Sequence, residues 1–509
     1  MKPGMDYRGW YIGAILAALC IGFRITCRGR GRNLIVKAVL LIPDGVGVRN
    51  FLCTGFLEQL LDQGEVVVWH ALHEELMAPY RARWHDDRVR WQALPAYRET
   101  LLARFFRQAK LYAQLYWKPQ ECATAAVLRV QMRNRPRHLG QRAFNALVRC
   151  LARACGHHAG TVWLDHLHTR AVLRSGATAA FSAFLRQCQP DILFCAHQRA
   201  SRAVPAMLAA QGLGIPAVTF IYSWDNLAKG RMAVHADHYL VWSDYMKAEM
   251  AAFYPEIAPE RVHVTGTPQF EPYFNDTLFQ TREEFFAEHC LDPARPVVCF
   301  SGDDVTTSPN DPQYLADLAE ALRAWPTRSA TRSAPQILFR CCPVDRSGRY
   351  AGVLARYPEI RVSEPRWEQA PGDWTQIVPT QADVALLANI AKHSDLVVNL
   401  GSTMAMDFAI FDKPGIFLAY DPAGAAMPNV EYIYRLPHFA SVHRLQPVYW
   451  VRSPHDLRET VLHALRHRAE KQAARRQWLE THALHPLNAA SRRCVEALCR
   501  IADTNMRSK

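Results

Sequence analysis

The chain has 509 residues, 50% hydrophobic and 21% charged, which is the balance of a globular protein and not of a disordered one. This length exceeds what one hydrophobic core usually supports, so two domains are expected. The formal net charge is +13, and residues 81–153 carry 16 lysines and arginines against four acids. Such a block suits an anionic partner, and it equally suits a set of solvated helix faces.

The 14 cysteines indicate a reducing compartment. They occur singly in apolar runs or as the adjacent pair Cys341 and Cys342, without CxxC or zinc spacing. The apolar run at 11–23 has thirteen residues, whereas about 20 are needed to span a bilayer. We therefore expect a cytoplasmic protein, and the N-terminal residues 1–33 to be either an interfacial membrane anchor or a dispensable extension.

From residue 36 onward, short β-branched runs alternate with helical patterns, which predicts an α/β fold. A turn with two flexible glycines, DGVGVRN at 44–50, is expected after the first strand, and a helix near 51–63 follows it. The first series of predicted strands covers 36–43, 65–72, 191–197, 215–223, 238–243 and 261–266. The second series covers 296–304, 336–343, 395–402 and 413–421, and helices follow at 454–467, 469–482 and 486–501.

Two such series predict two Rossmann-like domains, whose ligands bind where the carboxyl ends of the strands face each other across a cleft. The junction is expected near the proline-rich segment 266–274. The predicted divisions are an extension at 1–33, a first domain at 34–275 with a basic, helix-rich insert at about 74–158, a second domain at 276–485, and a C-terminal helix at 486–509.

The segment 399–421 is the most informative for function. Gly401 permits a tight turn after a strand, and Ser402 and Thr403 open a helix whose free amides could bind a phosphate. Asp407 follows one helical turn later, within reach of ribose hydroxyls. An ordinary Ser/Thr helix cap explains the same spacing equally well.

This segment resembles the nucleotide-binding part of GT-B enzymes, especially the CDP-glycerol glycerophosphotransferases. The resemblance rests on Ser402-Thr403, Asp407-Phe408-Ala409, Lys413-Pro414 and Tyr420-Asp421. It also implies that Arg340, at the end of a strand, contacts the donor phosphates. Cys342 stands where that family has a histidine, which is a departure from its pattern.

Further segments resemble glycosyltransferase-like proteins of bacterial surface polysaccharide synthesis. They are 196–201, 223–231, 266–274 and 301–322. Together these resemblances imply a GT-B fold, a first domain for the acceptor and a second for a nucleotide-sugar donor. They further imply a cell-envelope saccharide or lipid-linked acceptor. The charge of the basic insert and the aromatic residues within it predict peripheral contact with an anionic membrane. In GT-B enzymes generally, no bound metal or separate cofactor is needed.

Three positions that follow strands of the first series compete for the role of catalytic base: Asp225, His197 and Asp44, in that order. For each one, turn-capping or a structural hydrogen bond is the competing explanation. Arg49 and Arg199 lie close to two of them, and Trp224 could stack on a sugar or pack in the core. In the second domain, Thr306 lies in a loop that could line the donor pocket.

Four functions remain open. The first is transfer of a sugar from a nucleotide donor. The second is transfer of a polyol phosphate from a CDP-linked donor, against which the change at Cys342 counts. A UDP-sugar 2-epimerase is disfavoured because the paired glutamates of those enzymes are absent after Gly401. A non-catalytic protein that binds an anionic surface is the fourth, and no nucleic-acid partner is expected because the arginines are dispersed.

Overall fold

The computed structural model describes residues 36–118, 138–325, 333–425 and 430–508. The expectation for residues 1–33 lies outside these residues, as does part of the insert. Within the described ranges, no helix has the length and apolar character needed to cross a membrane.

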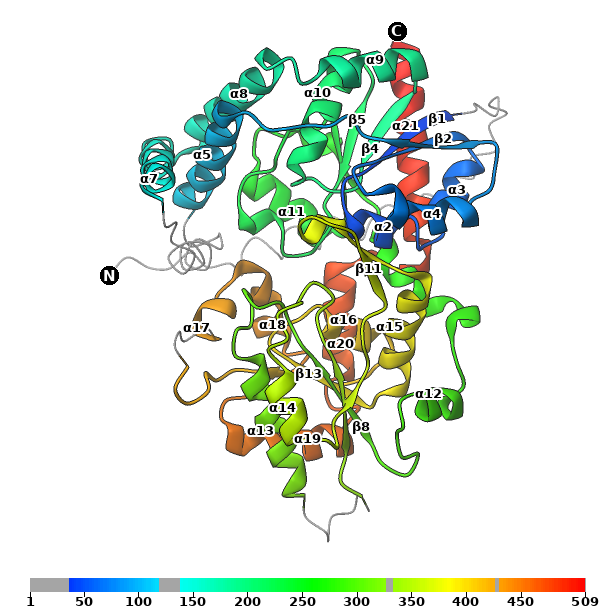
Figure 1. Cartoon of the computed structure of the whole chain (residues 1–509), viewed down its shortest axis with the longest axis vertical. Coiled ribbons are helices and arrows are strands. Elements are labelled where there is room, and N and C mark those ends of the chain that lie inside the picture. Colours follow the sequence, from blue (N-terminus) through cyan, green and yellow to red (C-terminus); the bar gives the residue numbers. More distant parts are fainter. Residues whose placement is uncertain (1–35, 119–137, 326–332, 426–429, 509) are drawn as a thin grey trace, which may run out of the picture. The chain divides into compact units, whose positions relative to one another are not determined.

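The first sheet has seven parallel strands in the order β3-β2-β1-β4-β5-β6-β7 (Figure 1). The strands are rich in Val, Ile and Leu because both faces of a parallel sheet are buried. Their bounds are β1 Val36–Ile42, β2 Gly64–His70, β3 Val89–Ala93, β4 Ile192–Cys195, β5 Ala217–Phe220, β6 His238–Val241 and β7 Val262–Val264.

The second sheet has six parallel strands in the order β10-β9-β8-β13-β14-β15, and a separate antiparallel pair joins β11 to β12. The α/β class with two Rossmann-like sheets is thereby confirmed. The bounds are β8 Val297–Ser301, β9 Gln336–Arg340, β10 Arg361–Val362, β11 Trp367–Gln369, β12 Ile377–Pro379, β13 Leu396–Asn399, β14 Gly415–Leu418 and β15 Tyr449–Val451.

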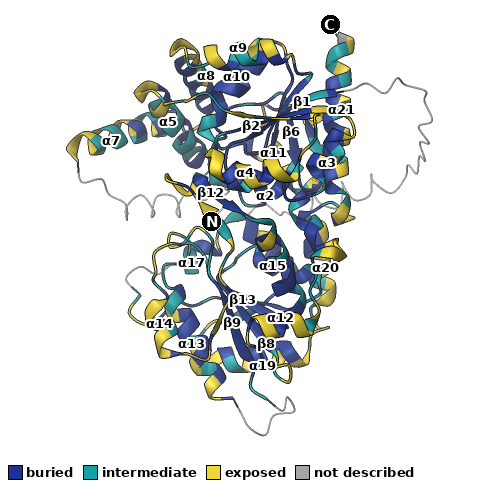
Figure 2. Ribbon diagram, turned by 45° about the vertical axis from the view of Figure 1, so that its right-hand side comes forward, coloured by how far each residue is buried: buried dark blue, intermediate teal, exposed yellow. Residues whose placement is uncertain are grey.

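The strands that sequence analysis missed are short or lie at sheet edges. β3 and β10 are edge strands with mostly exposed or half-buried residues, so they lack a continuous apolar run. In contrast, the central strands of both sheets are fully buried, and Figure 2 shows them in dark blue.

Helices surround both sheets. Those of the first half are α2 Gly45–Phe51, α3 Phe56–Leu61, α4 Glu74–Arg83, α5 Leu101–Trp117, α7 Leu139–Ala154, α8 His158–Arg174, α9 Ala179–Cys188, α10 Val204–Gly212 and α11 Asp244–Phe253. Those that follow are α12 Arg282–Glu288, α13 Asp311–Arg323, α14 Ala351–Arg356, α15 Gln381–His393, α16 Met404–Ile410, α17 Val430–Ile433, α18 Ala440–Leu445, α19 Leu457–Arg466, α20 Gln472–His482 and α21 Ala490–Ser508. The last helix returns to the first half, where α21 contacts α3 and β4.

The predicted insert contains both sheet elements and a separate helical layer. α4 and β3 belong to the first Rossmann-like unit, whereas α5 packs on both α7 and α8 around a small apolar core that these three helices share. That core is built from Ala109, Ala113, Val148, Ala152, Cys155 and Leu164.

The segment 44–50 is a helix and not the predicted turn. Asp44 caps α2 because its Oδ1 accepts hydrogen bonds from the amides of Val46 and Gly47, both at 3.1 Å. The two glycines were expected to supply flexibility, and this was wrong. A Cβ at Gly45 would lie 1.9 Å from the Ile377 carbonyl oxygen, so this glycine permits α2 to pack closely against β12.

Replacing Gly45 with Ala is therefore expected to destabilise the protein by at least about 1–3 kcal/mol, because a backbone atom cannot move away as a side chain can. Gly352 provides the control, since nothing lies within 4 Å of its Cβ position in α14. There, the change to Ala should stabilise by about 0.5–1 kcal/mol. Urea unfolding of both variants measures the difference, and equal midpoints would contradict the packing role.

Candidate functional site

A pocket of about 290 Å³ lies at the carboxyl ends of strands from both sheets. Its second-half wall follows β8, β9 and β13, and its first-half wall comes from α2, the segment after β5 and the short helix 268–274. Four residues expected to bind the donor line it: Arg340, Ser402, Thr403 and Asp407. Other lining residues include Arg49, Ser223, Gln269, Tyr273, Ser301, Asp303 and Cys342.

Arg340 is the last residue of β9 and is 5% exposed. Its Nη2 donates to both carboxylate oxygens of Asp383, at 2.9 Å each. Its Nη1 is buried and has no hydrogen-bond partner among the described residues. Because a buried guanidinium nitrogen without a partner is costly, this atom indicates space for an anionic ligand.

Arg49 brings a second guanidinium to the pocket from α2. It donates from Nη2 to the Gln269 side chain at 2.8 Å and from Nε to Asn50 at 3.1 Å. Within the described part of the chain, no carboxylate lies within ion-pair distance of it. Its charge is therefore held in place by neutral groups and remains available to an anion.

Asp407 lies buried between these cations. Burial raises the pKa of its carboxyl group to about 6, although a hydrogen bond with Tyr273 and the charges of Arg49 and Arg340 act in the opposite direction. Near neutral pH the carboxylate is thus mostly charged, and it can accept hydrogen bonds from ligand hydroxyls.

The turn at Gly401 has the left-handed conformation, with φ of +73°, and a Cβ there would lie 2.6 Å from the Phe439 ring. It does not offer the open row of amides that was expected. The Ser402 amide already donates to the Asn399 side chain at 2.9 Å, and the Thr403 hydroxyl accepts from Trp224 Nε1 at 3.2 Å. Since α16 has only seven residues, positive charge in the pocket comes mainly from the arginines.

Asp303 also lines the pocket, from the loop that was expected to place Thr306 there. Burial, followed by the nearby carboxylates of Asp311 and Asp304, raises the pKa of Asp303 to about 8. A carboxyl group that is protonated at neutral pH can donate a hydrogen bond. Its position shortly after the buried strand β8 brings it to the pocket. Thr306, by contrast, is exposed, bonds to Asp304 and does not line the pocket.

Asp44 and His197 form a buried pair at the ends of β1 and β4. His197 Nδ1 hydrogen-bonds to Asp44 Oδ2. Burial opposes ionisation of Asp44, but His197 and the two capping amides outweigh it and lower the pKa of this carboxyl group. His197 Nε2 has no partner among the described residues, and its ring lies 3.9 Å from that of Tyr222. Neither Asp44 nor His197 lines the pocket. Ser223, which follows Tyr222 in the sequence, does.

Asp225 is held in place by Ser223 at 2.7 Å, by Asn226 at 3.0 Å and by an ion pair with Lys229. Burial raises the pKa of the Asp225 carboxyl group. The charges of Lys229 and His438 have a larger effect in the opposite direction, so the net shift of this pKa is downward. A carboxylate with a low pKa is a weak base, so this geometry suits a residue that orders its loop. Trp224 packs against the rings of His438, Phe439, Trp478 and His482.

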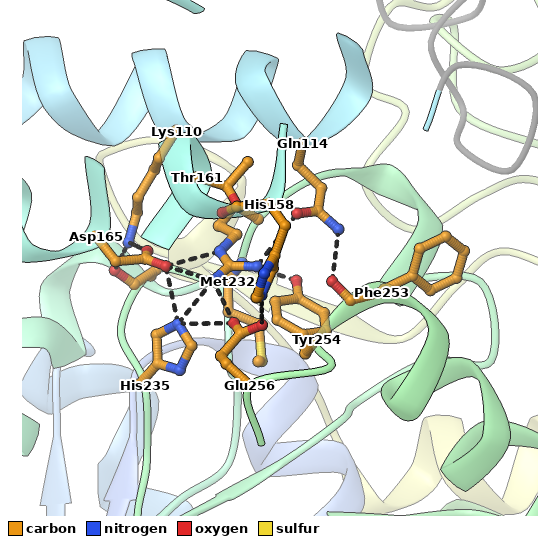
Figure 3. A network of polar contacts seen from close by, with 12 residues as sticks. Lys110, Gln114, His158, Thr161, Asp165, Met232, His235, Phe253, Tyr254 and Glu256 are labelled. Carbon is orange, nitrogen blue, oxygen red and sulfur yellow. Dashed lines mark hydrogen bonds and ion pairs between the residues drawn. The ribbon is translucent and has the colours of Figure 1, made fainter. Parts of the chain in front are cut away.

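Asp165, His235 and Glu256 come close enough to hold a metal ion (Figure 3). However, Arg231 occupies the centre of this group, with Nη2 at 2.6 Å from Asp165 and in contact with Glu256. Lys110 also pairs with Asp165, at 3.0 Å. Two cations thus balance two carboxylates, and the arrangement is that of an ion network that fixes α5 and α8 to the first sheet.

Replacing Arg231 with Met should destabilise the protein by about 3–5 kcal/mol, because it leaves the buried Asp165 carboxylate with too little positive charge. The Arg88–Asp86 pair is the control, since both side chains are substantially exposed. Arg88→Met should leave the stability nearly unchanged, because solvent screens an exposed ion pair. Chemical unfolding followed by circular dichroism tests both, and a similar small loss in the two variants would refute the role of the network.

Two parallel Rossmann-like sheets with a pocket between their carboxyl edges define the GT-B class of fold. Solved structures with this architecture match the chain over nearly its full length. A glycosyltransferase from Rickettsia africae is 9% identical, with a TM-score of 0.50, over 93% of this chain and 100% of that one. S. aureus MnaA, in a structure with UDP, is 11% identical with a TM-score of 0.50, over 92% and 97%.

A UDP-N-acetylglucosamine 2-epimerase also matches, at 11% identity and a TM-score of 0.50, over 92% of this chain and 96% of that one. At such identities the similarity establishes the fold alone. No family model matches the chain, and no curated protein matches it in sequence. The resemblance to CDP-glycerol glycerophosphotransferases therefore stays a resemblance.

Proposed function

We propose that this protein is a glycosyltransferase that takes its sugar from a nucleotide-activated donor. The observation that carries the proposal is the pocket in which Arg340 Nη1 lacks a partner and Arg49 lacks a carboxylate among the described residues. Two guanidinium groups beside one pocket match the charge of a diphosphate. Asp407 is the acceptor for the ribose hydroxyls of the same ligand.

In this reaction the bond between the sugar and the diphosphate breaks, and negative charge develops on the departing phosphate oxygen. Arg340 and Arg49 stabilise that charge from fixed positions, which is where electrostatic catalysis is most effective. These arginines supply the positive charge that the step requires, so the proposal includes no metal ion and no separate cofactor.

The acceptor hydroxyl needs a base, and His197 is the better candidate of the three. Its Nε2 is without a partner in the described structure, and Asp44 holds the opposite ring nitrogen. A carboxylate in that position fixes the tautomer and stabilises the imidazolium that forms. Asp225 then orders the neighbouring loop. The acceptor is a cell-envelope saccharide or a lipid-linked one.

A 2-epimerase is the second candidate, because structures named as epimerases have the same fold. Transfer of a polyol phosphate from a CDP-linked donor is the third, although Cys342 lines the pocket where that chemistry would place a histidine. The products separate the three: a glycosylated acceptor, an epimerised nucleotide sugar, or released CMP.

The first test is a thermal-shift screen with UDP-, GDP-, CDP- and TDP-linked donors. A ligand at one hundred times its dissociation constant adds about 2.7 kcal/mol of stability to the native state. We expect stabilisation by at least one donor, and its loss in Asp407→Ala. The absence of a response to every donor would overturn the proposed function.

A further inference from the structure

The solvent-facing side of α7 is unusually apolar. Leu139 is 78% exposed and Leu147 is 63% exposed. The exposed positions between and beyond them are mostly small: Gly140, Ala143, Ala146, Cys150 and Ala154. The opposite side of the helix already packs on α5 through Val148 and Ala152. The helix therefore has one apolar side in the core and a second one in solvent.

The start of α5 extends this exposed apolar surface. Phe105 lies 5.7 Å from Phe144, and Arg153 lies over the ring of Tyr116, so α5 and α7 run in parallel. Their first turns are consequently at the same end. Leu101 and Leu102, which are 69% and 56% exposed, begin α5 at that end, where Leu139 begins α7.

The charge of this surface is of one sign. The described segments 98–118 and 138–164 contain a single acid, Glu99, and Arg107 already pairs with it. The outer turns of the two helices carry Arg104, Arg142 and Arg153, all exposed. No described carboxylate lies within ion-pair distance of these three arginines. An anionic partner would therefore meet positive charge together with exposed leucines.

We propose that Leu101, Leu102, Leu139, Leu147, Arg142 and Arg153, here named the α5–α7 face, bind the surface of a membrane that contains anionic phospholipids. Leucines enter the boundary between headgroups and acyl chains, while arginines bind the phosphates beside them. Nucleic acid would use the arginines but not the leucines, and a protein partner would not require this excess of positive charge. The proposal does not depend on the proposed donor.

The insert is also firmly attached to the segment that borders the pocket. Lys110 of α5 donates to the carbonyl of Ala233 at 2.7 Å, and Asp165 of α8 binds Arg231. This segment begins at Ser223, on the pocket wall, and includes Asp225 and Lys229. A membrane held by the α5–α7 face would thus fix the orientation of the pocket relative to the lipid surface, as a lipid-linked acceptor requires.

Flotation of the full chain with vesicles tests the proposal. We expect binding to phosphatidylglycerol-containing vesicles, weaker binding to phosphatidylcholine vesicles, and a loss of binding at high salt. Leu139→Gln/Leu147→Gln and Arg142→Gln/Arg153→Gln should each weaken binding to the anionic vesicles by about tenfold or more. Val362→Gln is the control, because Val362 is 37% exposed in β10 of the second sheet, outside the helical layer.

Thermal unfolding of each variant verifies that it is folded, since all five positions are exposed. No binding to anionic vesicles by the natural chain would overturn the proposal. So would undiminished binding in both double variants, which would assign the lipid contact to another part of the chain. A third outcome is salt-sensitive binding of RNA. If the arginine variant abolishes it and the leucine variant leaves it unchanged, the face is a nucleic-acid surface instead.

Discussion

Replacement of Arg340 by Met is expected to lower the affinity for a nucleoside diphosphate by about 10- to 150-fold. Hydrogen bonds to charged groups contribute about 1.5–3 kcal/mol each, and this guanidinium is positioned to make at least one with the ligand. The same change removes the partner of Asp383, which is itself buried. It should therefore also destabilise the protein, by about 3–5 kcal/mol.

A double variant separates the two effects. In Arg340→Met/Asp383→Asn, the carboxylate charge is gone. The Arg366 amide and Trp367 Nε1 donate to different oxygens of Asp383, so an asparagine there keeps one of these two hydrogen bonds. Stability should recover in part, whereas diphosphate binding should stay weak. Isothermal titration with UDP, or with whichever nucleotide the donor screen identifies, measures the affinity. If the double variant binds as tightly as the natural protein, Arg340 is a structural residue only.

Replacement of His197 by Gln is expected to reduce turnover of the identified donor by about 100- to 10,000-fold, the contribution of a positioned general base. Donor affinity should stay unchanged, because His197 does not line the pocket. Two measurements distinguish a loss of catalysis from a loss of binding. They are the rate of transfer to a saccharide acceptor and the thermal shift that the donor produces.

Asp44→Asn is the matched variant for this test. Asparagine caps helices as well as aspartate does, so α2 should stay folded, while the charge that stabilises the His197 imidazolium is removed. Turnover should fall in this variant too. If His197→Gln retains turnover within a few-fold of the natural protein, the base lies elsewhere.

The periodicity of the sequence was sufficient for the central strands. Runs such as 191–197 and 296–304 are buried on both faces, so each is continuous in apolar residues and distinct from its polar flanks. Edge strands such as β3 lacked this signal. The segment 44–50 was misread because Gly45 and Gly47 are typical of turns, whereas here close packing against another segment requires the absence of a side chain.

For the site, sequence alone placed Arg340, Ser402, Thr403 and Asp407 after strands, and parallel strands end at a common edge. It could not determine which polar atoms are already satisfied. That the Ser402 amide is bound by Asn399, or that Arg340 Nη1 has no partner among the described residues, depends on how the side chains pack in three dimensions. The local sequence pattern predicts which residues follow a strand. Whether their polar atoms already have hydrogen-bond partners depends on the packing of the whole chain.

The sequence by itself thus determined the α/β class, the two series of strands and the residues at their carboxyl ends, because these follow from local periodicity. Only the tertiary structure decided that Asp44 pairs with His197, that Arg49 and Arg340 share one pocket, and that Arg231 fills the space a metal would need. Such pairings join segments up to hundreds of residues apart, and their energies depend on burial and distance, which no local pattern encodes.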